Sequence, residues 1–61
     1  MKPYIQIIDS VNEREMYVFI AHIVLITQED EVTRINFVNK DPIWVDETAK
    51  EIIQLINKAN K

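Results

Sequence analysis

This chain of 61 residues is 48% hydrophobic, carries a formal net charge of −3 and contains neither Cys nor Gly. The absence of Cys excludes disulfide bridges and Cys-ligated zinc sites, and the absence of Gly excludes the phosphate-cradling loops of the Walker and Rossmann types. The negative net charge also disfavours a broad surface for nucleic-acid backbones.

The length predicts a single domain over residues 1–61 with a small hydrophobic core. A chain of this size buries only about 60% of the surface that its unfolded form exposes. Eleven Ile and six Val are a large apolar content for so small an interior, and oligomerisation is the common remaining support when disulfides and metals are absent. No apolar run reaches the ~18 residues that span a bilayer, and no secretory leader is recognised. We therefore expect a cytoplasmic homo-oligomer, most simply a dimer.

The first half of the chain is rich in β-branched and aromatic residues. Tyr4–Ile8 is a short β-branched run followed by polar residues, which predicts a strand and a turn. Residues 16–26 contain one polar side chain, His22, and as a single strand they would extend ~36 Å, too long for this domain. We expect the segment to break into a strand over about 15–20, a bend or single helical turn over 20–23, and a strand over about 23–28.

The next strand is predicted by strict alternation. After the polar turn Gln28–Glu31, the side chains of Val32–Val38 alternate between two faces. Ile35 and Phe37 lie on one face with Thr33, and this face is expected to point toward the core.

The following turn is expected at Asn39–Pro42, because Pro restricts the residue before it to extended geometry. A brief last strand then covers Ile43–Val45. Without Gly, other residues must adopt any left-handed conformation. The expected positions are Asn12, Asp30, Asn39 and Asp41.

The end of the chain changes to helical spacing. Thr48 and Glu51 form a capping box, which places the start of a helix near residue 48, with Asp46 as the alternative cap. Ile52, Ile53 and Ile56 lie on its apolar face and are expected to pack on the sheet. The predicted fold class is α+β: a small antiparallel β-meander of four to five strands with one C-terminal amphipathic helix packed on it.

The residues able to carry chemistry are few. His22 is the only imidazole and Ser10 the only serine, and neither has a suitable partner nearby in the sequence. Glu29–Glu31 lacks the alternating ligand spacing of a calcium loop. Glu47 and Glu51 lie one helical turn apart, but Glu51 is used in the helix cap, so the two are not expected to act as a general acid/base pair. We therefore expect no catalytic residue, no metal site and no cofactor.

The five aromatic side chains could form a stacking platform for nucleic acid, but at alternating strand positions they more often serve core or cross-strand packing. They are Tyr4, Tyr17, Phe19, Phe37 and Trp44. Trp44 lies beside the helix entry and is an interface candidate, because large aromatic residues are enriched at interfaces.

Two segments resemble the FlbD-like small proteins associated with flagella and swarming motility. Ile20–Ile26 and Ile43–Ile53 follow that pattern, with Val45, Glu47, Thr48, Ile52 and Ile53 matching in place. The resemblance covers about residues 15–56 and departs from the family at the Asn39–Pro42 turn and at Lys50. It implies a bacterial or phage β-meander-plus-helix protein that acts by association, with no catalytic residues to transfer.

Three functions are compatible with this sequence. The first is a non-enzymatic interaction or regulatory protein that acts as a homo-oligomer. The second is a nucleic-acid-binding regulator using a strand face, and the third is a small-molecule sequestering protein with an interface pocket near Trp44 and Tyr17. The candidate oligomer interface consists of Tyr17, Phe19, Val24, Ile26 and Trp44. The candidate nucleic-acid contacts, for the second function only, are Lys2, Arg34 and Lys40.

Overall fold

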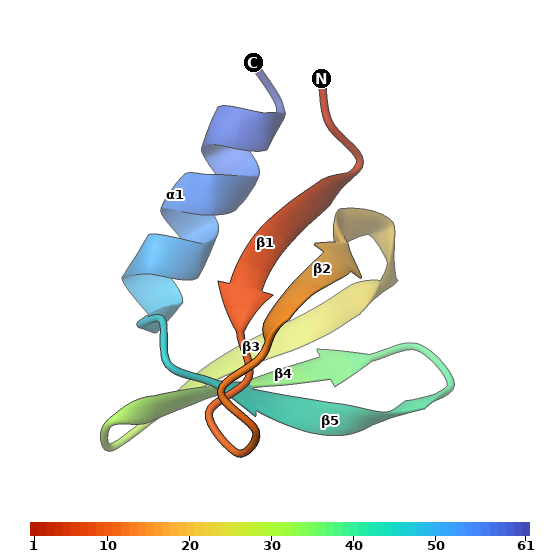
Figure 1. Ribbon diagram of the computed structural model, residues 1–61. Helices are drawn as coiled ribbons and strands as arrows, with labels where there is room; N and C mark the ends of the chain where they lie inside the picture. Colours follow the sequence, from red (N-terminus) through yellow and green to blue (C-terminus); the bar gives the residue numbers. More distant parts are fainter.

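The computed structural model describes all 61 residues and contains five antiparallel strands in two sheets, followed by one C-terminal helix (Figure 1). β1 pairs with β2, and β3, β4 and β5 form a three-stranded sheet in that order. The elements are β1 (Tyr4–Ile8), β2 (Glu15–Phe19), the 3-10 turn η1 (Ile20–His22), β3 (Ile23–Glu29), β4 (Val32–Phe37), β5 (Lys40–Val45) and α1 (Ala49–Ala59). The predicted α+β meander with a C-terminal helix is confirmed.

The long apolar run breaks where the sequence predicts. η1 follows β2 directly, and the residues on both sides of it, Phe19 and Ile23, are extended. This turn ends the first sheet and begins the second, so the meander is divided between two sheets.

The last turn is shorter than predicted. The connection consists of Val38 and Asn39, and β5 already begins at Lys40. Pro42 is tolerated within this strand because β5 is an edge strand, and the β4–β5 register shifts there, between the Ile35–Ile43 and Phe37–Lys40 pairs.

Only one of the four expected left-handed positions is found. Asn39 has a φ of 56°, whereas the second left-handed residue is Glu13, at 55°. The predictions for Asn12, Asp30 and Asp41 are wrong. The turn after β1 is wound around Asp9, whose carbonyl accepts from Glu13 N, and the chain must then reverse so that Arg14 O accepts from Asp9 N. Glu13 makes that reversal.

The core lies between the two sheets and the helix. Its buried hydrophobic residues are Ile5, Ile7, Val18, Ile35, Val45 and Ile52. Thr33 is also buried, and Phe37 packs against the core, as the alternation in β4 predicts. The prediction that Ile53 packs on the sheet is wrong, because half of its side chain is exposed. α1 touches β1 and β3 along a stripe of Ile52, Leu55, Ile56 and Ala59 that leaves Ile53 at the margin.

Hydrogen bonds join the elements at both ends of β1. At its carboxyl end Ile8 O accepts from Asp46 N, and Trp44 O accepts from Ser10 N. At its start Lys2 N donates to Ala59 O at 2.8 Å, so both ends of the chain lie at the same end of the molecule (Figure 1). No helix in the structure has the length and apolar character needed to cross a membrane.

Candidate functional site

The outer surface of the β1–β2 hairpin carries a cluster of exposed aromatic side chains. Strand alternation turns Ile5, Ile7 and Val18 inward, which leaves Tyr4, Tyr17 and Phe19 outside. The Tyr4 ring lies 5.5 Å from that of Tyr17 and 6.4 Å from that of Phe19, both edge-on, and the His22 ring lies 6.1 Å from Phe19. We call Tyr4, Tyr17, Phe19 and His22 the aromatic face.

One edge of β2 has no strand beside it. The hydrogen bonds between β1 and β2 are flanked at one end by Ile20 N donating to Pro3 O and at the other by Asp9 N donating to Arg14 O. In an antiparallel pair such bonds involve every second residue, so every second residue of β2 directs its main-chain groups toward β1. The intervening residues therefore direct their N–H and C=O groups away from β1, and β2 pairs with no other strand. This open edge of β2 consists of Glu15, Tyr17 and Phe19.

A small apolar groove runs beside the open edge of β2. It has a volume of about 160 Å³ and lies between β2, η1 and the β4–β5 hairpin. Met16 and Val18 line it from one side and Phe37 and Ile43 from the other. Lys40 lies over the Phe37 ring, with its Nζ 5.6 Å from the ring centre.

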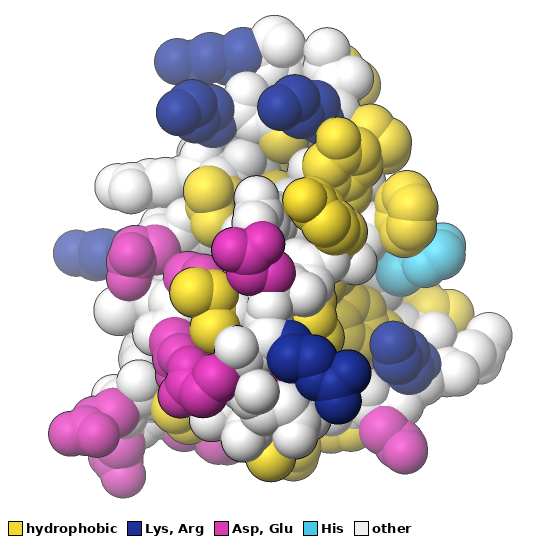
Figure 2. Space-filling view, in the orientation of Figure 1, with side chains coloured by type: hydrophobic (Ala, Val, Ile, Leu, Met, Phe, Trp, Pro, Cys, Tyr) yellow, Lys and Arg dark blue, Asp and Glu magenta, His cyan; other side chains and the backbone are white.

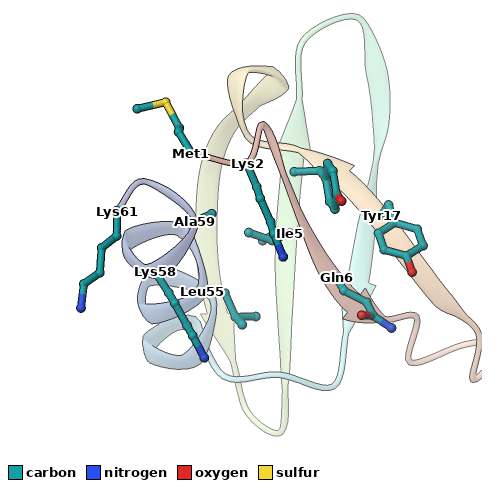
Figure 3. Close-up of a pocket in the computed structure, with 10 residues that line it drawn as sticks. Met1, Lys2, Ile5, Gln6, Tyr17, Leu55, Lys58, Ala59 and Lys61 are labelled. Carbon is teal, nitrogen blue, oxygen red and sulfur yellow. The ribbon is translucent and has the colours of Figure 1, made fainter.

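A larger cleft lies on the other side of the hairpin, between β1 and the second half of α1. It has a volume of about 600 Å³. Its charged lining residues are all lysines, namely Lys2, Lys58 and Lys61, and its apolar lining includes Ile5 and Leu55. We call this space the basic cleft (Figure 3).

Charge is unevenly distributed over the molecule. Figure 2 shows basic side chains without acidic ones at the end where both termini lie, and acidic side chains together with other basic ones over the rest of this face. This agrees with the sequence, since residues 1–8 and 52–61 contain Lys2, Lys58 and Lys61 but no Asp or Glu. Figure 2 also shows hydrophobic side chains gathered beside the single His.

The outer face of the three-stranded sheet holds a polar network. Trp44 Nε1 donates to Glu29 Oε1 at 3.0 Å, and Arg34 pairs with the same carboxylate at 3.3 Å. Trp44 and Arg34 are register partners on β5 and β4. This network fixes the indole and gives Glu29 a structural role.

The structure distributes the predicted interface residues over several surfaces. Tyr17 and Phe19 share the aromatic face, whereas Val24 is exposed on β3 and Ile26 packs against the core. Trp44 lies on β5 in the network with Glu29, and it lines neither cavity. Only the first two residues are brought together.

The predicted nucleic-acid contacts lie in three different environments. Lys2 lines the basic cleft, Lys40 lines the groove beside β2, and Arg34 is paired with Glu29. They do not form one basic face.

The other chemically competent side chains make local bonds. Ser10 Oγ donates to Trp44 O, Glu47 accepts from Ile8 N, and Glu51 accepts from Thr48 N. His22 is exposed beside Phe19. No three His, Cys, Asp or Glu side chains are grouped so that they could hold a metal ion.

Sequence reasoning missed the basic cleft. The one signal in the sequence is that the last part of the helical segment contains Lys58 and Lys61 but no acidic residue. Lys2 is distant from both in the chain, so the sequence does not connect it with them. Comparison with protein-family models, curated proteins and solved structures finds no match to this chain.

Proposed function

We propose that the protein is a non-enzymatic interaction protein that acts as a two-fold homodimer through the open edge of β2. The observation that carries this proposal is the combination of unpaired main-chain groups and exposed aromatic side chains on one strand. An unprotected edge strand is a template for pairing with another chain.

A second copy of the same strand is the occupant that fits this edge. Antiparallel pairing about a two-fold axis at Tyr17 places Glu15 opposite Phe19 of the other copy, and Tyr17 opposite itself. All the outward N–H and C=O groups of the open edge are then paired. Such an interface is self-complementary, as closed two-fold dimers require.

Pairing would also cover apolar surface that the monomer leaves in water. Tyr17 is 63% exposed and Phe19 53% exposed, and the groove of Met16, Val18, Phe37 and Ile43 lies next to the edge. Adjacent aromatic rings across paired strands add to the stability of a sheet. The result is a four-stranded sheet in which the aromatic faces of both copies are continuous.

Light scattering during size exclusion tests the proposal. The wild-type protein is expected at twice the 7.2 kDa of one chain. Tyr17→Lys places like charges opposite each other at the two-fold axis and is expected to give the monomer mass with unchanged circular dichroism.

Val24→Lys is the matched control, because Val24 is also exposed, at 64%, but lies on β3. It is expected to remain dimeric. A wild-type monomer, or a dimer lost in Val24→Lys and kept in Tyr17→Lys, would contradict the proposed interface.

A further inference from the structure

The basic cleft has the chemistry of an anion-binding site with an apolar floor. Figure 3 shows Lys2 from the N-terminal arm extending along β1 and Lys58 extending along α1, and both line the cleft, while Lys61 and Met1 project outward at its rim. No Asp or Glu lines this space. An anion entering it therefore meets two ammonium groups, and the acidic side chain bonded to its lining is Glu15, whose carboxylate accepts from Gln6 Nε2 at 2.9 Å.

The floor and the far wall of the basic cleft favour a ligand with an apolar part. Ile5 is buried beneath it, and Leu55 and Ala59 are half-buried on the helix side. Tyr4 and Tyr17 stand on the opposite side, where their edge-on contact holds the rings together. A volume of about 600 Å³ accommodates several side chains of a ligand.

The edge of β1 that faces the cleft offers main-chain groups as well. Tyr4 and Gln6 lie between residues whose main-chain groups are hydrogen-bonded to β2. Their own N–H and C=O groups therefore point the other way, toward α1. The neighbouring positions on this edge are bonded: Lys2 N donates to Ala59 O, and Ile8 N donates to the Glu47 carboxylate. No hydrogen bond joins the main chain of Tyr4 or Gln6 to the helix.

We propose that the basic cleft binds an acidic peptide segment that carries at least one large apolar side chain. Carboxylates of the peptide pair with Lys2 and Lys58, its apolar side chain lies against Leu55 and Ala59, and its amides bond to the free groups of Tyr4 and Gln6. Charge complementarity selects the acidic sequence, and the free main-chain groups select a peptide over a nucleic acid. The main-chain groups of this site lie at the β1 edge of the hairpin, opposite the β2 edge proposed for the dimer, and the Tyr17 side chain borders both.

Fluorescence anisotropy with synthetic peptides tests the proposal. The probe is a labelled short peptide in which Glu residues flank a central Phe. It is expected to bind the wild-type protein with an affinity that falls as salt is raised. Replacing its Glu residues by Lys should abolish binding, and replacing the Phe by Ser should weaken it.

The protein variants compare lysines inside and outside the cleft. Lys2→Gln with Lys58→Gln should raise the Kd for the probe about tenfold or more, as expected for lost charge-assisted contacts. Lys50→Gln removes an exposed lysine from the other end of the same helix and should leave the Kd unchanged. Circular dichroism confirms that each variant is folded.

Three results would overturn the proposal. The first is that the probe does not bind, and the second is that Lys50→Gln weakens binding as much as the double variant does. The third is that single-stranded oligothymidylate binds more tightly than the peptide, which would assign the cleft to nucleic acid. A monomeric wild-type protein that still binds the probe through Lys2 and Lys58 would leave this site standing while contradicting the dimer.

Discussion

Asp9 organises the turn between β1 and β2 through its side chain. Its Oδ1 accepts from Val11 N at 2.8 Å and from Asn12 N at 3.4 Å. The hydrogen bond from Val11 N–H lowers the pKa of the Asp9 carboxyl, with smaller contributions in the same direction from Asn12 and Arg14, and together they outweigh the opposing effect of desolvation. The ionised carboxylate is therefore part of the folded turn.

Asp9→Asn is expected to destabilise the protein at neutral pH and to have little effect in acid. Because the folded-state pKa is lowered from its ordinary value of 3.8, the charge contributes stability above that value, and this contribution is lost as pH falls through the folded pKa. Thermal unfolding at pH 7 and below pH 3 would measure the difference. Asp41→Asn is the control, since Asp41 is exposed and makes no hydrogen bond through its side chain. A difference between Asp9→Asn and wild type that persists unchanged in acid would contradict the role of the charge.

At the scale of the helix, the cap is the feature that fixes where α1 begins. Thr48 Oγ1 accepts from Glu51 N at 3.2 Å, and the Glu51 carboxylate accepts from Thr48 N at 3.0 Å. Thr48→Ala should lower the free energy of unfolding by ~0.5–2 kcal/mol. Thr48→Ser retains the hydroxyl and should lose much less, as chemical denaturation of both variants can establish. Equal stability of the Ala variant and the wild type would show that the cap does not hold the helix.

The helix face gives a second test at this scale, with two adjacent isoleucines as a matched pair. Ile52 is fully buried, so Ile52→Ala should cost ~2–5 kcal/mol. Ile53 is half exposed, and Ile53→Ala should cost only about 1 kcal/mol. If Ile52→Ala leaves the protein unfolded, Ile52→Val provides a milder change for the same comparison. The reverse order of the two losses would mean that α1 is rotated relative to the structure.

For the whole molecule, the distribution of charge bears on nucleic-acid binding. The net charge is −3, and Lys2, Arg34 and Lys40 lie in three different environments. The single helix packs against the core and is not free to enter a groove. We therefore expect no binding of duplex DNA in a mobility shift assay at physiological salt, and micromolar binding under that condition would revive the nucleic-acid alternative.

The sequence by itself determined the elements of this protein and most of their limits. The strands, the break at Ile20–His22, the alternation in β4 and the capping box at Thr48 all depend on neighbours within a few residues, and each is found in the structure. Local hydrogen bonds and side-chain periodicity are sufficient to specify such features. The resemblance to FlbD-like proteins stays a prediction.

Only the tertiary structure decided which residues from distant segments meet. It divided the meander into two sheets and turned Ile53 to the margin of the helix contact. It also placed Lys2 and Lys58 in the lining of one cleft. The physical reason is that these arrangements depend on how α1 and the two sheets pack on one another, and the spacing of residues along one element does not specify that packing.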